Sequence, residues 1–181
     1  MEETLIARKG LPPELLDLLR LFPREGWQRA PGFQGLAAFW LDRHLGFRSM
    51  MDMLAKEAEA MVDGRLPPER WKQRVSAVGG HLVQDLLGHH QIEDDAYFPQ
   101  MMQLEKRLGR GFDILDRDHH ALDALLDGFV KSANKALQSK DARAAAGRFR
   151  DGLVPFERQL IRHLEDEEDL IIPVILKHRM R

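Results

Sequence analysis

The 181-residue sequence contains no cysteine. This absence excludes disulfides, iron–sulfur ligation and thiolate zinc sites, so any metal must be held by nitrogen and oxygen ligands. An excess of basic charge is also lacking, because the net charge is -2, and we expect no nucleic-acid partner. No apolar run approaches the roughly 20 residues that a membrane-spanning helix needs, and we expect no membrane partner.

Several catalytic motifs are missing as well. The sequence has no His-Glu-x2-His zinc-protease motif, no Glu-x2-His pair of the ferritin-like carboxylate proteins, no glycine-rich phosphate loop and no Gly-x-Ser-x-Gly elbow. The N-terminal segment MEETLIARKGLPPELL lacks an apolar signal core, and a cytoplasmic location is therefore expected.

Glycine and proline divide the remaining sequence into long helical stretches. Strand-like alternation is absent, and the breaks predict helices over 33–63, 68–107, 112–138 and 142–178. Because three short connections join four long helices, we predict an all-α, up-down-up-down four-helix bundle over residues 35–181.

Residues 1–34 are predicted to form an N-terminal arm with one short helix, from Pro13 to Phe22. Asp141 is a plausible N-cap of the last long helix. Prolines are expected to end or kink helices locally at three positions, which are Pro99, Pro155 and Pro173.

Each predicted long helix carries an apolar stripe at spacings of three and four, with a histidine in its middle. In the first helix the stripe consists of Ala37, Trp40, His44, Phe47, Met51, Leu54 and Ala58. The other three stripes contain His89 with Glu93, His119, and His163 with Glu167. Such stripes face the core of a bundle, so these polar side chains are predicted to be buried.

The two halves of the chain align with each other at an offset of 74 or 75 residues. The aligned pairs are His44 with His119, His89 with His163, Glu93 with Glu167, and Pro99 with Pro173. The other histidines align with leucine or proline, so they are not predicted to be ligands, although a contribution of His90 or His120 stays open. These histidines are His81, His90, His120 and His178.

Histidine and glutamate four residues apart lie on one helix face and can reach the same metal centre. A carboxylate can also bridge two metals, and a buried carboxylate needs a partner because its isolated burial is very costly. Four imidazoles and two carboxylates would give two nitrogens per metal and two shared carboxylates. The predicted ligands of this metal pair are His44, His89, Glu93, His119, His163 and Glu167.

The roles of several neighbouring acids stay open. Asp94 and Glu168, which are repeat-related, are either outward charges or alternative ligands. Asp118 could orient His119 or cap locally, and Asp123 is expected to be exposed or to contact a ligand. The remaining acids of the EDEED run are expected on a solvated face; they are Glu165, Asp166 and Asp169.

Taken together, His44 and the segments HHQIEDDAYFP (89–99), DHHAL (118–122) and HLEDEEDLIIP (163–173) resemble the hemerythrin-like HHE cation-binding domain. The resemblance covers roughly residues 35–178. It implies a non-haem di-iron centre bridged by two carboxylates and an oxo or hydroxo group. By position, the four predicted histidines would be terminal ligands, and Glu93 and Glu167 would bridge.

Members of that family carry or sense oxygen, handle nitric oxide, take part in iron homeostasis or help to repair iron–sulfur clusters. Two differences between this sequence and family members argue against two of these roles. Asp123 stands where oxygen carriers have a further histidine, and the cysteine-containing extension of cluster-repair relatives is missing. We therefore favour a di-iron protein that senses oxygen, nitric oxide or redox state, or that handles iron.

Two alternatives remain at this point. One is a di-iron oxidoreductase that acts on peroxide, oxygen or nitric oxide. The other is a structural or interaction bundle that binds zinc or no metal, since histidine and carboxylate accept zinc, manganese and iron alike. A small diatomic ligand or peroxide is the expected partner, and whether there is a protein partner stays open.

Overall fold

The computed structural model describes residues 4–180. The first three residues of the predicted arm (1–34) and the last residue of the predicted bundle (35–181) lie outside this range. The long helices of the described part are α2 (Ala38–Val62), α3 (Pro68–Ile92), α5 (Gly109–Gln138) and α6 (Ala142–His178), and it contains no strand.

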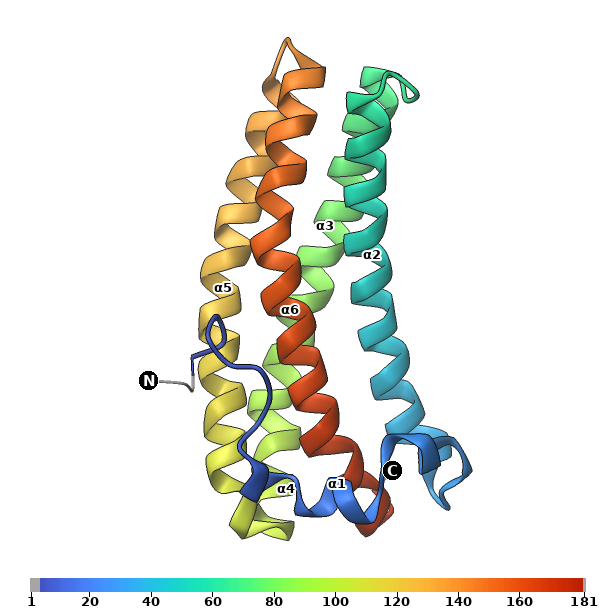
Figure 1. Ribbon diagram of the computed structural model, residues 1–181, viewed down its shortest axis with the longest axis vertical. Helices are drawn as coiled ribbons and strands as arrows, with labels where there is room; N and C mark the ends of the chain where they lie inside the picture. Colours follow the sequence, from blue (N-terminus) through green and yellow to red (C-terminus); the bar gives the residue numbers. More distant parts are fainter. Residues whose placement is uncertain (1–3, 181) are drawn as a thin grey trace.

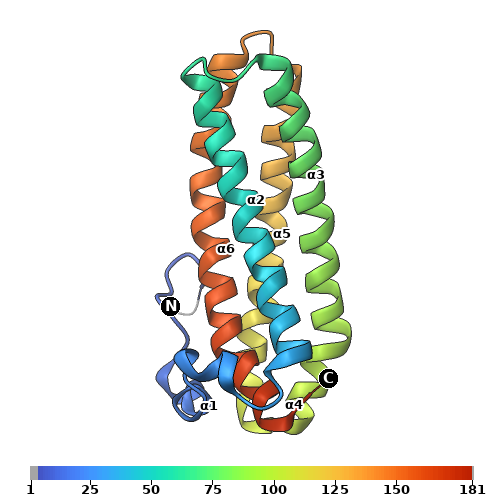
Figure 2. The same cartoon turned by 90° about the vertical axis from the view of Figure 1, so that its right-hand side faces the viewer.

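The long helices run alternately up and down (Figures 1 and 2). Helix α2 packs against α3 and α6, and α5 packs against the same two helices. The prediction of an all-α, up-down-up-down four-helix bundle is therefore confirmed.

Local sequence signals account for most of the helix boundaries. The Asp141 carboxylate accepts a hydrogen bond from the Ala144 backbone N–H at 3.0 Å, as expected of an N-cap. Pro68 begins α3, where its missing N–H costs nothing because the first helical N–H groups have no partner within the helix.

The predicted second helix, 68–107, is helical without a gap from residue 68 to residue 104, but it is not α-helical throughout, and Glu105 interrupts it. The α-helical pattern stops at Ile92 and is followed by a π-helical turn (Glu93–Tyr97), α4 (Phe98–Leu104) and a 3-10 turn (Lys106–Leu108). Pro99 cannot donate to the preceding turn, which favours a change of hydrogen-bond pattern there. Glu93 thus lies at the junction of two helix geometries.

The other two prolines, which were predicted to end or kink helices, do not end the helix that contains them. Helix α6 continues through Pro155 and Pro173 without interruption. Each proline removes one hydrogen bond, and in this long helix that loss does not end it.

Helix α2 begins later than predicted, at Ala38 instead of residue 33. The π-type segment Phe33–Ala37 contains Gly35 with a φ of 106°, and Gly32 before it has a φ of 89°. Positive φ values are strained for residues with a side chain, so the two glycines permit this sharp entry. Helix α5 begins earlier than residue 112, at Gly109.

The predicted arm helix is divided into smaller pieces. They are a 3-10 turn (Pro13–Leu15) and α1 (Asp17–Leu21), and a second 3-10 turn (Arg24–Arg29) follows beyond the predicted helix. The arm covers the end of the bundle that carries α4 (Figures 1 and 2). Its Leu18 and Trp27 are buried in one apolar cluster with Trp40 and Leu170 of the bundle.

Two apolar clusters fill the bundle. One contains Phe47, Leu86 and Leu122, and the other contains Trp40, Phe98 and Leu115. Along α2, α5 and α6 the predicted ligands lie between residues of the first cluster and residues of the second. His89 and Glu93 likewise lie between Leu86 of the first cluster and Phe98 of the second, so the ligands form a polar layer. Within residues 4–180, no helix combines the length and apolar character needed to cross a membrane.

Candidate metal centre

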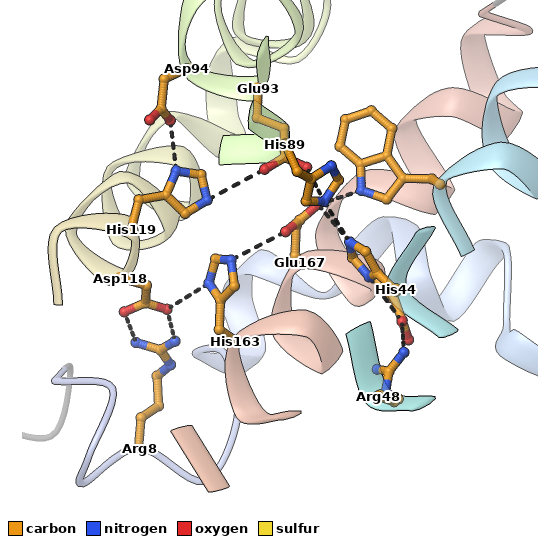
Figure 3. Close-up of polar contacts among 12 residues, drawn as sticks. Arg8, His44, Arg48, His89, Glu93, Asp94, Asp118, His119, His163 and Glu167 are labelled. Atoms are coloured by element: carbon orange, nitrogen blue, oxygen red, sulfur yellow. Dashed lines mark hydrogen bonds and ion pairs between the residues drawn. The ribbon is translucent and has the colours of Figure 1, made fainter. Parts of the chain in front are cut away.

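The six predicted ligands meet in one buried layer of the bundle (Figure 3). Every long helix contributes, and Glu93 is the first residue of the π-helical turn. The most accessible of the six, His89, is only 7% exposed, and Glu93 and Glu167 are fully buried. The layer contains His44 from α2, His89 from α3, Glu93, His119 from α5, and His163 and Glu167 from α6.

The histidines form two pairs. The Nε2 atoms of His44 and His89 lie 3.1 Å apart. Two nitrogens about 2.1 Å from one metal and at right angles to each other would be about 3 Å apart, so this spacing suits a shared metal. The rings of His119 and His163 form the second pair, with centroids 4.9 Å apart.

The two glutamates span these pairs. Glu93 has Oε1 at 2.8 Å from His89 Nε2 and Oε2 at 3.5 Å from His119 Nε2. Glu167 has Oε1 at 3.4 Å from His44 Nε2 and Oε2 at 3.3 Å from His163 Nε2. Each carboxylate therefore directs one oxygen to each histidine pair, as a bridging ligand must.

Several of these inward atoms have no hydrogen-bond partner although they are buried. They are both carboxylate oxygens of Glu93, Oε2 of Glu167, and Nε2 of His119 and His163. An unsatisfied buried polar group costs about 1–3 kcal/mol, and more if it is charged. Cations bound among these atoms would satisfy them together, so the donor set fits metal ions held by nitrogen and oxygen.

Three of the four histidines turn their outer nitrogen toward a carboxylate. Nδ1 of His44 donates to Glu168 at 3.0 Å, and Nδ1 of His119 donates to Asp94 at 2.8 Å. A third contact, at 3.4 Å, joins Nδ1 of His163 to Asp118 (Figure 3). A proton on Nδ1 leaves a lone pair on Nε2, which faces inward as a metal ligand requires.

These contacts define the roles of the acids that the sequence left open. Asp94 and Glu168 are neither outward charges nor members of the inward layer, because each holds the outer nitrogen of a histidine. Asp118 contacts His163 and not the neighbouring His119. Asp123 is exposed.

The expectation for the EDEED run is wrong for Asp166, which is fully buried. Its partner is Arg8 of the arm, whose Nε donates to the Asp166 carboxylate at 2.7 Å. Arg8 also pairs with Asp118 through its other guanidinium nitrogens. No sequence signal pointed to this arginine, because the arm carries no repeat and no periodic stripe.

Glu168 is held by arginines as well as by His44. Arg48 contacts Glu168 Oε1 at 2.8 Å, and Arg24 of the arm contacts Oε2 at 2.9 Å. Burial opposes ionisation, but the hydrogen bonds from His44 and Arg48 prevail and lower the pKa of Glu168 to about 2. The group that orients His44 is thus a carboxylate anion at neutral pH.

In the metal-free protein the inward groups have strongly altered pKa values. Burial opposes protonation of His163, but Asp118 and Glu167 raise its pKa to about 9. Burial lowers the pKa of His89 to about 3. Burial and the nearby Glu167 charge raise the pKa of Glu93, whereas His44 and His163 overcome burial and lower the pKa of Glu167. In the metal-free layer, the negative charge of Glu167 is therefore balanced by the positive charge of protonated histidine.

A family model described as the hemerythrin HHE cation binding domain matches residues 36–175. The chain belongs to this family. No curated protein and no solved structure gave a significant match.

As a member of the hemerythrin HHE family, the chain binds cations. Among the described residues, two clusters of side chains could hold a metal ion: one is His44, His89, Glu93 and Glu167, and the other is His90, His119 and His163. His90, which the repeat had set aside, is therefore next to the predicted ligands. A second inward histidine could have been suspected from the His89–His90 doublet, but its direction depends on the helix packing.

Proposed function

We propose that the protein binds two iron ions in a carboxylate-bridged centre and uses them to sense oxygen, nitric oxide or redox state. The observation that carries this proposal is the placement of Glu93 and Glu167. Each has one oxygen near each histidine pair, and three of the four oxygens make no hydrogen bond. Iron is favoured by family membership, and the nitrogen and oxygen donors suit it.

The chain's own residues divide the work. His44 and His89 would hold one ion, His119 and His163 the other, and the two glutamates would bridge them. A bound iron pair would supply reversible electron transfer and a coordination position for a small molecule. Asp94, Asp118 and Glu168 keep the histidines in the required tautomer.

The burial of the centre supports a small ligand in place of a bulky substrate. The inward layer is closed on both sides by apolar clusters. A surface cleft between arm residues 4–13 and α5 has Asp118 in its wall. Since Asp118 contacts His163, a molecule entering this cleft would be separated from the centre by few side chains.

Metal analysis of protein purified without added metal is the direct test. We expect two iron ions per chain, or uptake of two after anaerobic addition of ferrous iron. Spectral changes on adding oxygen or nitric oxide without turnover would support sensing, whereas steady consumption of peroxide or nitric oxide would indicate an oxidoreductase. A chain that takes up no iron pair would refute the proposal.

The carboxylates that contact the outer nitrogens of the histidines lead to a prediction about metal affinity. Asp94→Asn replaces the anion at His119 Nδ1 by a neutral amide, and loss of such a partner lowers metal affinity by about 10–100-fold. Chelator competition measures the change. Asp123→Asn is the matched control, because the exposed Asp123 is one helical turn after His119. Equal affinities in the two variants would show that Asp94 does not support a ligand.

Metal binding is also expected to release protons. At pH 7 the metal-free protein carries a proton on His163, whose pKa is raised to about 9, and the raised pKa of Glu93 favours the protonated form of that carboxyl as well. Both groups must lose these protons to act as ligands. Titration calorimetry with cobalt(II) in buffers of different ionisation enthalpy should show this release. Heats that do not depend on the buffer would contradict the prediction.

The raised pKa of His163 also affects the stability of the metal-free protein. Because the pKa of His163 is raised on folding, its stabilising contribution is complete below the unfolded pKa and is lost as the pH rises through about 9.

A further inference from the structure

We propose that His90 is an additional ligand of the metal on the His119–His163 side, which makes the two halves of the centre unequal. The proposal rests on the proposed function, because it adds a residue to the same metal pair. The sequence repeat argues against it, since the position aligned with His90 is Leu164. Three structural observations argue for it.

The first observation is the direction of two successive residues on α3. Successive residues on an α-helix point about 100° apart, and α3 packs between α2 and α5. His89 faces His44 of α2, with ring centroids 5.2 Å apart. His90 faces His119 of α5, with ring centroids 4.0 Å apart and planes inclined by only 10°. The doublet thus serves both sides of the centre.

The second observation is the spacing of possible ligand atoms. One nitrogen from each of His90, His119 and His163 lies within 4.8 Å of the other two. A single ion about 2.1 Å from each nitrogen needs separations below about 4.2 Å, so the side chains must move closer together to share an ion. The stacked rings of His90 and His119 must also turn out of their parallel arrangement, because a metal lies in the plane of each imidazole that binds it. The ring of His163 is 5.5 Å from that of His90 and nearly perpendicular to it, at 81°.

The third observation is that His90 is unsatisfied. It is 4% exposed, and neither of its ring nitrogens has a hydrogen-bond partner. The ring of His90 contacts the rings of its neighbours, and these contacts give its two nitrogens no structural role. A purely structural residue at this position would be better apolar, as Leu164 is at the aligned position.

The outcome is a centre with two imidazoles on one metal and three on the other. Asp123, four residues after His119, is exposed and has no side-chain nitrogen, so this position of α5 does not supply the third imidazole. His90 supplies it from α3 instead. The metal with three imidazoles is then expected to lose affinity selectively when His90 is removed, because the other group, His44 and His89 with the two glutamates, is unchanged.

The test compares His90→Leu with wild type and with His120→Leu. His120 is the matched control because it adjoins a predicted ligand but is exposed. Iron(II) binding is measured anaerobically by chelator competition, and the stability of the metal-free forms is measured by denaturation. For His90→Leu we expect one tight site to remain and the second to weaken by about 100-fold or more, beyond the usual effect of losing a group behind a ligand.

The metal-free His90→Leu protein should be at least as stable as wild type, because an unsatisfied buried imidazole is replaced by an apolar side chain. If leucine impairs folding, His90→Gln retains a polar side chain without an imidazole and should show the same selective loss. Two unchanged binding steps, or equal loss in both steps, would overturn the role of His90. Failure of wild type to bind two ions would instead refute the proposed function.

Discussion

Glu93→Gln is expected to abolish tight binding of the metal pair while leaving the metal-free fold intact. Glutamine has the size of glutamate but has a single oxygen, so it cannot direct one oxygen to His89 and the other to His119 as Glu93 does. Because each bridge serves both ions, affinity for the pair should fall by more than the roughly 10–100-fold typical of a group behind a ligand.

The fold should tolerate this change for a specific electrostatic reason. Burial and the charge of Glu167 raise the pKa of Glu93 well above its usual range, which favours the neutral form of Glu93 in the metal-free protein. A glutamine is a close neutral substitute for that form. The denaturation midpoint of the metal-free variant should therefore stay near that of wild type.

Metal analysis and denaturation of the same preparations test both halves of this prediction. Glu165→Gln is the control, because Glu165 lies on α6 near the ligands but its side chain is 44% exposed. It should retain both ions. If the folded Glu93→Gln protein still bound two ions with wild-type affinity, Glu93 would not be a bridge.

Arg8→Ala is expected to destabilise the protein far more than the loss of an exposed charge pair in the arm. The Arg8 side chain and the carboxylates of Asp118 and Asp166 with which it pairs are at most 3% exposed. Removing one partner of a buried ion pair costs about 3–5 kcal/mol because a buried charge is left uncompensated. Arg162 still contacts Asp166 at 2.6 Å, so we expect the lower end, about 3 kcal/mol.

Denaturant unfolding of the metal-free protein measures this loss without interference from metal binding. For a chain of this size, about 3 kcal/mol corresponds to a decrease in Tm of roughly 6–12 °C. Arg20→Ala is the control within the arm. Its pair with Asp17 is 61% and 53% exposed, and pairs of that kind contribute about 0–1 kcal/mol. Equal effects of the two substitutions would contradict a structural role for Arg8.

The helix pattern was predictable because it depends on local information. Helix lengths, the Asp141 cap and the apolar stripes follow from residues a few positions apart, and the bundle was predicted from them. The change of hydrogen-bond pattern after Ile92 was missed because Pro99 offers several outcomes. A proline can end the helix, kink it or change its hydrogen-bond pattern, and Pro155 and Pro173 do not end α6.

The contacts behind the histidines were beyond the reach of sequence reasoning. Asp94 and Glu168 were found by the repeat, but their partners are histidines on other helices. Which carboxylate meets which ring depends on the rotation and height of packed helices. Asp118 illustrates this, since it contacts His163 across the helix interface and not its own neighbour His119.

By itself, the sequence determined the all-α bundle and the six inward side chains that meet in one layer, because periodicity and the internal repeat report which helix face is buried. Only the tertiary structure decided the parts that break the repeat. Arg8 reaches Asp118 because the arm folds back over the bundle, and His90 turns toward His119 because α3 lies between α2 and α5. Both depend on packing between segments that are far apart in the chain.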